Sequence, residues 1–297
     1  MIEYNGQKVI IMCCSKCNMS CKHCYISYSG NRNPMELLKL VKKLKEKYEV
    51  VLNGAEVLTN IEYLNSYKEL GQKYILTNGY ELYKNIKIID VLKKYNITSV
   101  SISYHFGIHD KISLILSTSL KKVFKELKNN NLNYRIMTTI TSKNYNDIEK
   151  MCEEAIKLGA DGIYFTNYIQ QGNAIKMDDS LKLSQEQITS FFKQLIKVRK
   201  KYTKDELLIE RDGGFGPNEL LEKDHFVCPS VNNLVVLTPD NNLYPCIFLA
   251  KPGYEIGKLV DGKLYIFEEY NNINTGTKCF AKEICNNNKC LIKKYNN

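Results

Sequence analysis

Short apolar runs alternate with longer amphipathic segments over the first two thirds of the chain. In residues 34–47, for example, Leu37, Leu38, Val41 and Leu44 recur at the spacing of one helix face. Glycine and asparagine often stand between the segments and mark turns. The pattern predicts strands at residues 9–12, 49–52, 74–77, 97–104, 133–140, 162–165 and 207–210, and helices at residues 34–47, 60–70, 81–95, 119–130, 144–158 and 184–202.

Strands that alternate with helices are typical of βαβ units and a parallel sheet. The units predict an α/β fold, a partial (β/α)6 TIM-like barrel over residues 1–212. Active sites of barrels lie at the carboxyl ends of the strands. The loop that follows the first strand is therefore expected on the functional face of the barrel.

The pattern changes after residue 212. Gly213, Gly214, Gly216 and Pro217 interrupt the alternation and predict a domain boundary. Residues 234–238 and 243–246 flank a turn and predict a β-hairpin. Residues 213–297 are therefore expected to form a small cysteine-rich C-terminal domain that contains this hairpin.

Composition narrows the class of protein. A hydrophobic content of 44% and a charged content of 25% are ordinary for a soluble globular chain. No apolar run approaches the ~20 residues of a membrane-spanning helix, and residues 1–14 lack the pattern of a signal peptide. The eleven cysteines are an odd number, which favours reduced thiols in the cytoplasm over a disulfide framework. The net charge of +10 is interpreted as solvated lysine-rich helix faces, and no nucleic-acid-binding signature is present.

Three cysteines stand close together at C-x3-C-x2-C spacing, namely Cys17, Cys21 and Cys24. Three thiolates on one short loop suit a soft metal ion or an iron–sulfur cluster. Three protein ligands would leave one iron of a four-iron cluster open, as a catalytic zinc site keeps one position open. Cys14 and Cys17 also fit half of a zinc ribbon, so the cysteines alone leave the register open. We interpret Cys13 and Cys14 as small buried hydrophobic residues.

The C-x3-C-x2-C motif resembles that of the radical S-adenosylmethionine (radical SAM) superfamily. The resemblance implies a catalytic [4Fe-4S] cluster on Cys17, Cys21 and Cys24, with an open iron that binds the amino and carboxylate groups of SAM. In this family an electron from the cluster cleaves SAM, and a 5′-deoxyadenosyl radical takes a hydrogen atom from the substrate. His23 stands where the family carries an aromatic residue near the adenine.

The segment Gly54-Ala55-Glu56-Val57 resembles the Gly-Gly-Glu-Pro stretch with which the family contacts the SAM amino group. Ala55 and Val57 depart from that pattern. Gly54 still allows close approach of the backbone, and Glu56 supplies a carboxylate. A plain strand-to-helix turn is the alternative interpretation.

The resemblance to the radical SAM core implies further contacts with SAM from residues on later strands. Ser103 on the fourth strand after the motif would face the methionyl carboxylate or ribose, although His105 departs from the usual aspartate. Arg135 would pair with the same carboxylate, and a surface arginine is the alternative. Asn167 and the loop 170–174 follow a later strand, where family members contact SAM.

The C-terminal part resembles the shorter relatives of SPASM domains, often called twitch domains, which hold an auxiliary four-iron cluster. The hairpin that ends in Tyr244-Pro245-Cys246 fits the start of such a domain. The resemblance implies one auxiliary [4Fe-4S] cluster, and a zinc site is the alternative. The expected ligands are Cys228, Cys246 and two of Cys279, Cys285 and Cys290.

The resemblance implies an oxygen-sensitive enzyme that uses a flavodoxin or ferredoxin as electron donor. Relatives with this tail modify ribosomally made peptides by crosslinking, epimerisation or dehydrogenation, and others oxidise small alcohols such as aminocyclitols. We expect peptide modification, with a small-alcohol dehydrogenase as the alternative. Because sixteen residues precede Cys17, a peptide substrate would need direct capture or a separate leader-peptide-binding protein.

A further expectation concerns a catalytic base that this chain lacks. Sulfatase-maturing relatives carry an aspartate base directly after the cysteine that corresponds to Cys246, where this chain has Ile247. Conversion of a serine or cysteine side chain to formylglycine is therefore not expected.

A contrasting hypothesis comes from a different functional class of protein. In that hypothesis the chain is a basic zinc-binding protein that binds nucleic acid and has no catalytic activity.

Overall fold

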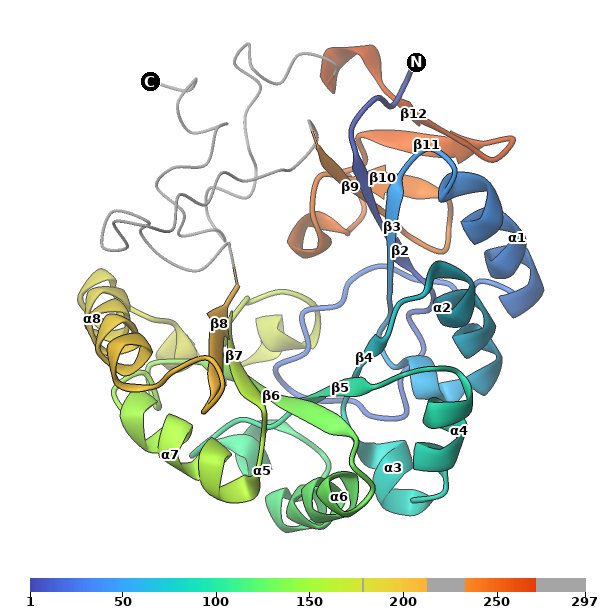
Figure 1. Ribbon diagram of the computed structural model, residues 1–297. Helices are drawn as coiled ribbons and strands as arrows, with labels where there is room; N and C mark the ends of the chain where they lie inside the picture. The colour runs from blue at the N-terminus through green and yellow to red at the C-terminus, as the bar shows by residue number, and fades with distance from the viewer. Residues whose placement is uncertain (178, 213–232, 271–297) are drawn as a thin grey trace.

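The computed structural model describes residues 1–177, 179–212 and 233–270. Parallel strands line an incomplete ring, and helices cover its outside (Figure 1). One parallel pair is formed by β2 (Lys8–Met12) and β3 (Glu49–Asn53). A second parallel sheet contains β4 (Tyr74–Thr77), β5 (Ser99–Ser103), β6 (Asn133–Ile140), β7 (Gly162–Asn167) and β8 (Leu208–Arg211).

Each strand from β2 to β7 is followed by a helical connection that leads to the next strand. The main helices in this order are α1 (Pro34–Leu44), α2 (Leu64–Leu70), α3 (Tyr80–Lys84) with α4 (Ile88–Lys94), α6 (Ser117–Asn129), α7 (Ile148–Leu158) and α8 (Gln185–Lys201). The short α5 (His109–Ile112) lies within the connection after β5. The arrangement confirms the predicted α/β fold and partial (β/α)6 barrel.

Helix ends follow from local side-chain chemistry. The carboxamide oxygen of Asn33 accepts the N–H groups of Met35 and Glu36 and so caps α1. The helix predicted at residues 81–95 is in fact two helices, because Asn85 adopts an extended conformation with φ −144°. The Asn85 side chain accepts the N–H of Lys87 at 3.2 Å and starts the second helix.

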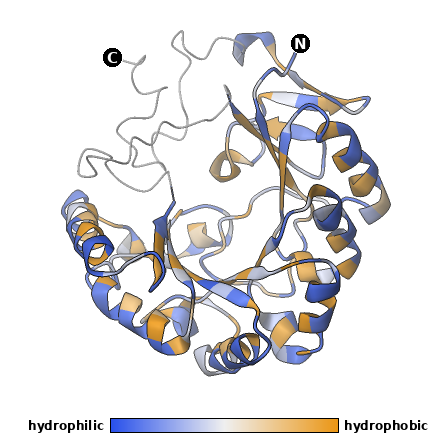
Figure 2. Cartoon of the chain, viewed as in Figure 1, coloured by the Kyte–Doolittle hydropathy of each residue, from blue (hydrophilic) through white to orange (hydrophobic). Residues whose placement is uncertain are grey.

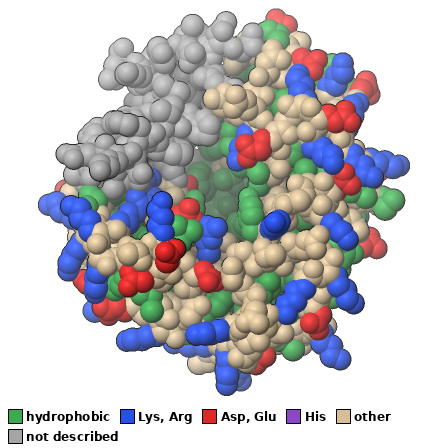
Figure 3. Space-filling model, in the orientation of Figure 1, with side chains coloured by type: hydrophobic (Ala, Val, Ile, Leu, Met, Phe, Trp, Pro, Cys, Tyr) green, Lys and Arg blue, Asp and Glu red, His purple; other side chains and the backbone are tan. Residues whose placement is uncertain are grey.

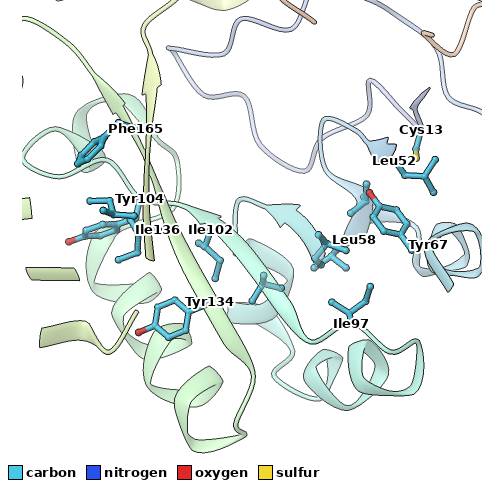
Figure 4. Close-up of a cluster of buried hydrophobic side chains, with 14 of the residues drawn as sticks. Cys13, Leu52, Leu58, Tyr67, Ile97, Ile102, Tyr104, Tyr134, Ile136 and Phe165 are labelled. Atoms are coloured by element: carbon cyan, nitrogen blue, oxygen red, sulfur yellow. The ribbon is translucent and has the colours of Figure 1, made fainter. Parts of the chain in front are cut away.

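Apolar side chains fill the space between the strands and the outer helices. Figure 2 shows hydrophobic positions on the inner faces of the helices and hydrophilic positions outside, and Figure 4 shows part of this core. Phe124 of α6 stacks on Tyr134 of β6 with ring centres 5.2 Å apart. Cys13 and Cys14 are at most 1% exposed within the same core, as predicted. No helix in the described ranges is both long and apolar enough to cross a membrane.

The described C-terminal strands extend the first sheet of the barrel. The predicted hairpin is present as β9 (Leu234–Leu237) and β10 (Asn242–Tyr244). β9 pairs in parallel with β2, and β11 (Gly257–Val260), β12 (Lys263–Ile266) and β1 (Ile2–Glu3) complete the sheet. The described C-terminal strands thus share one sheet with β2 and β3. β2, which leads into the cysteine motif, is hydrogen-bonded along both edges.

Candidate active site

The cysteine motif lies in the long loop between β2 and α1, which crosses the inside of the ring (Figure 1). Cys17 is exposed, and Cys21 and Cys24 are half-buried. Burial, together with smaller contributions from the charges of Glu56, Cys21 and Cys24, raises the pKa of the Cys17 thiol to about 11. The three thiols thus lie close enough to interact electrostatically. Iron that bound these thiols would have to displace their protons, so its binding would release protons.

The connection after β5 supports one side of this loop. The N–H of Lys22 donates to the carbonyl of Ile112 at 3.0 Å. The sulfur of Cys21 lies 3.9 Å from the hydroxyl of Ser113. These contacts hold Cys21 against the segment around α5, at the carboxyl end of β5.

The connection after β7 supports the other side. The N–H of Ala174 donates to the carbonyl of Cys24 at 3.3 Å, and the side chain of Asn173 donates to the carbonyl of Cys21 at the same distance. Gly172 has φ +59°, and a Cβ at this position would lie 2.7 Å from the carbonyl oxygen of Cys24. A residue without a side chain is therefore required where this connection packs against the cysteine loop.

Gln171 stands directly before this close contact and is only 3% exposed. Within the described part of the chain, neither its amide nitrogen nor its amide oxygen has a hydrogen-bond partner. Leaving a buried amide unpaired costs about 1–3 kcal/mol. Such a group, one residue before the contact of Gly172 with the cysteine loop, fits a site that receives a polar ligand.

Glu56 is fully buried beneath the cysteine loop. Its carboxylate accepts the hydroxyl of Thr77 at 2.9 and 3.0 Å, the N–H of Asn78 at 2.7 Å and the N–H of Leu58 at 3.1 Å. Burial raises the pKa of Glu56 to about 7, although these hydrogen bonds oppose the change. The carboxylate joins the turn after β3 to the turn after β4.

Gly54 and Ala55 lie between this carboxylate and the cysteine loop. The N–H of Ala55 donates to the carbonyl of Cys14 at 3.0 Å. A Cβ at Gly54 would lie 3.1 Å from the sulfur of Cys14, so a larger residue would crowd the loop. The predicted segment after β3 is thus in direct contact with the chain that carries the motif.

Three histidine rings lie together beside the motif. The ring centres of His23 and His105 are 4.4 Å apart, and those of His105 and His109 are 5.5 Å apart. The ring of His105 accepts the N–H of Thr139 at 3.0 Å, and His23 contacts the carbonyl of Ile112 at 3.1 Å. Burial lowers the pKa of all three, that of His109 to about 4. The rings are therefore neutral at pH 7 and present an aromatic, uncharged wall.

The other predicted SAM contacts lie at different depths in the barrel. Ser103 and Asn167 end β5 and β7, at the edge where the cysteine loop crosses. Arg135 lies near the start of β6 and forms an ion pair with Glu210 of β8, with an N–O distance of 2.5 Å. The structure thus brings Ser103 and Asn167 to the motif end of the strands, whereas Arg135 lies toward the other end.

Cys246 approaches the motif from the C-terminal hairpin. Tyr25 follows Cys24, and its ring meets that of Phe248 edge-on at 5.5 Å. Burial raises the pKa of Tyr25, and the charges of Asp212, Cys24 and Cys246 add to this. Cys246 therefore lies near the residue that follows the motif. The remaining predicted auxiliary ligands, Cys228, Cys279, Cys285 and Cys290, lie outside the described residues.

Over residues 1–177, 179–212 and 233–270, no three His, Cys, Asp or Glu side chains are grouped as ligands of a single metal ion. In a four-iron cluster each cysteine binds a different iron atom, so its sulfurs are spaced more widely than the ligands of one ion. The loop with three thiols, one of them exposed, has the donor chemistry of such a cluster. The residues present therefore fit a cluster with three protein ligands.

Comparisons with known proteins place this geometry among solved structures. No family model and no curated protein matches the chain. The crystal structure of Streptococcus suis SuiB bound to the precursor peptide SuiA is similar, with a TM-score of 0.71 and 15% sequence identity. The similarity covers 99% of this chain and 71% of that chain.

SuiB bound to S-adenosylmethionine has a TM-score of 0.67 at 16% identity, covering 86% of this chain and 63% of that one. The protein anSMEcpe with bound AdoMet and the Kp18Cys peptide has a TM-score of 0.64 at 18% identity, covering 95% of this chain and 88% of its own. SuiB and anSMEcpe are radical SAM enzymes. The chain therefore has the partial-barrel fold of the radical SAM enzymes, as the resemblance of its motif implies.

Sequence patterns do not single out three residues that the structure places here. Gln171 belongs to a loop with a weak resemblance, and only its burial without a partner marks it. His109 lies four residues after His105, and the non-helical turn at residues 106–108 brings the two rings together. Asn78 is part of a Thr-Asn-Gly turn signal, which says nothing of its contact with Cys17.

We predict that Glu56→Gln changes the pH dependence of stability. Because folding raises the pKa of Glu56 from about 4.5 to about 7, the native state holds the proton more tightly than the unfolded state. The wild-type free energy of unfolding should therefore fall, relative to that of Glu56→Gln, by about 2–3 kcal/mol between pH 5 and pH 8. Urea denaturation at several pH values measures this difference. The exposed Glu62→Gln is the matched control, and a difference that stays constant for Glu56→Gln would contradict the assignment.

Proposed function

We propose that this chain, which has the fold of the radical SAM enzymes, is itself a radical SAM enzyme that modifies a peptide. The observation that carries the proposal is the placement of Cys17, Cys21 and Cys24 on one loop at the carboxyl ends of the barrel strands. These residues would hold three irons of a [4Fe-4S] cluster and leave the fourth iron for SAM. When bound, the cluster supplies the electron that cleaves SAM.

The surrounding residues have the properties that a SAM site needs. Gln171 offers an amide donor and acceptor that are buried and free within the described structure. His23 and His105 offer neutral aromatic edges beside the motif, where an adenine could pack. Gly54, Ala55, Ser103 and Asn167 stand at the same end of the strands. We propose that these residues bind SAM and exclude water from it.

The peptides bound in similar solved structures support a peptide substrate for this chain. SuiB is bound to the precursor peptide SuiA, and anSMEcpe is bound to the Kp18Cys peptide. Figure 3 shows a hollow at the centre of the ring, with hydrophobic side chains in its wall. A peptide segment entering this hollow would approach the motif.

The proposal includes one auxiliary [4Fe-4S] cluster and an external electron donor of the flavodoxin or ferredoxin type. Cys246 supports the auxiliary cluster because it follows β10 of the C-terminal hairpin and lies near Tyr25. Cys228 and two of Cys279, Cys285 and Cys290 would complete its ligands. Cys246 would then place the auxiliary cluster close to the substrate hollow.

The first test replaces Cys17, Cys21 and Cys24 together by Ala in protein purified and reconstituted without oxygen. We expect loss of 5′-deoxyadenosine formation and loss of about four irons per chain, with about four irons retained at the auxiliary site. Cys152→Ala is the matched control, because Cys152 is a buried thiol on α7. It should keep both iron and SAM cleavage.

Formation of 5′-deoxyadenosine by the triple variant would refute the catalytic assignment. Complete loss of iron from the triple variant would instead contradict the auxiliary cluster. Zinc in place of iron, in a colourless wild-type protein, would favour the contrasting zinc-protein hypothesis.

The second test concerns Gln171. Gln171→Leu keeps the size of the side chain but removes both polar atoms, so the dissociation constant for SAM should rise about tenfold. Equilibrium binding of SAM to the iron-loaded protein measures this change. Gln185→Leu, at an exposed position at the start of α8, is the matched control. An unchanged dissociation constant for Gln171→Leu would remove Gln171 from the SAM site.

The third test follows the product in candidate peptides by mass spectrometry in deuterated water. Ile247 packs against the apolar cluster that contains Met12 and Tyr28, so this position offers no proton acceptor. We therefore expect no formylglycine, since loss of a positioned base typically costs about 10²–10⁴-fold in rate. Gain of deuterium at an α-carbon would identify epimerisation, and loss of a hydrogen pair would identify crosslinking or dehydrogenation. An aldehyde trapped by a hydrazide would overturn this expectation.

A further inference from the structure

We infer that Asn78 is a positioning residue for the catalytic cluster, through an N–H···S hydrogen bond from its side chain to Cys17. The inference rests on the proposed function, because it takes Cys17 as an iron ligand. The amide nitrogen of Asn78 lies 3.5 Å from the sulfur of Cys17. Asn78 stands directly after β4, in the turn that leads to α3.

The orientation of the Asn78 carboxamide is determined by its neighbours. The N–H of Tyr80 points at one end of the carboxamide, at 2.9 Å. A backbone N–H only donates, so this end must be the carboxamide oxygen. The NH2 group is therefore the end that faces Cys17, and the assignment does not depend on distinguishing nitrogen from oxygen directly.

The two hydrogens of this NH2 group have separate acceptors. One is directed to the carboxamide oxygen of Asn18 at 2.8 Å, which leaves the other for the sulfur of Cys17. Asn18 is oriented in turn, because its own NH2 group donates to the carboxylate of Glu81 at 2.9 Å. A chain of hydrogen bonds thus runs from Glu81 through Asn18 and Asn78 to the cysteine.

The backbone of Asn78 is held as firmly as its side chain. Its N–H donates to the buried carboxylate of Glu56, which also accepts the hydroxyl of Thr77. The same hydroxyl accepts the N–H of Gly79 at 3.1 Å. The donor is therefore fixed in place before any cluster binds. Little further conformational entropy is lost when it forms a hydrogen bond with a cluster-bound cysteine.

An N–H donor at a cluster sulfur favours the state with more negative charge. Iron-bound cysteine is a thiolate, and reduction adds one electron to the cluster, so the hydrogen bond is stronger in the reduced state. Hydrogen bonds to the sulfurs are among the features that set the reduction potential of iron–sulfur clusters. Asn78 should thus make the catalytic cluster easier to reduce and should hold Cys17 in position for iron.

The test compares wild type with two variants of Asn78. Asn78→Asp keeps the acceptor for the Tyr80 N–H but places an oxygen where the donor was. Asn78→Ser keeps a short capping oxygen, adds no charge and cannot reach the sulfur. Asn85→Asp is the matched control, because the Asn85 side chain also accepts the backbone N–H two residues further on, that of Lys87, and the residue is exposed. All four proteins are loaded with iron and sulfide without oxygen.

Redox titration followed by electron paramagnetic resonance measures the midpoint potential. The paramagnetic resonance signal that changes when SAM is added is assigned to the catalytic cluster. At the wild-type midpoint, we expect both Asn78 variants to show a reduced-to-oxidised ratio about threefold to tenfold lower, where tenfold is about 59 mV for one electron. Asn85→Asp should match the wild type.

Equal midpoints in wild type and both Asn78 variants would overturn the inference, as would an equal decrease in Asn85→Asp. Loss of the SAM-sensitive signal from folded Asn78 variants would support it, since Cys17 would no longer be held for iron. Loss of the helical circular dichroism from these variants would overturn it, because Asn78 would then only stabilise the turn. Absence of a SAM-sensitive signal in the wild type would refute the proposed function instead.

Discussion

The three motif cysteines lie on a loop without regular secondary structure, so their positions depend on hydrogen bonds from neighbouring connections. The connection after β5 holds Cys21 through Ile112 and Ser113, and the connection after β7 holds the backbone of Cys24. The turn after β4 contacts Cys17. Each connection begins where a parallel strand ends, so the barrel brings to one edge groups that are far apart in the chain. The geometry of the thiols is therefore a property of the barrel and not of the loop alone.

Buried polar groups at this edge divide into two kinds. The carboxylate of Glu56 has several donors around it and belongs to the framework, since it ties the turn after β3 to the turn after β4. The carboxamide of Gln171 is as deeply buried but has no partner among the described residues. Exposure alone does not distinguish these two residues, whereas their hydrogen bonds separate a carboxylate that builds the framework from an amide that, in the proposed function, binds SAM.

Much of the fold can be predicted from the sequence, because each barrel strand is a short apolar run bounded by turn residues. The break at Asn85 is missed, since the apolar spacing continues across it and only the extended backbone of Asn85 interrupts the helix. The cysteine motif can also be predicted from the sequence, because its three cysteines are close together in the chain and lie on one loop. The direction of Glu56, the ion pair of Arg135 with Glu210 and the burial of Gln171 depend on packing between strands distant in sequence, which a pattern along the chain does not contain. The four tail cysteines outside the described residues remain a prediction.

The pairing of β2 with β9 has a consequence for the order in which the chain folds. β2 is synthesised well before β9, which follows it by more than two hundred residues. Until β9 emerges from the ribosome, one edge of β2 lacks its partner, and a pairing across such a long separation forms slowly. The strand that presents the cysteines thus acquires its final support only late in synthesis. If the proposed cluster forms, iron that reached the nascent chain would meet thiols whose scaffold is still incomplete, so its insertion would follow translation.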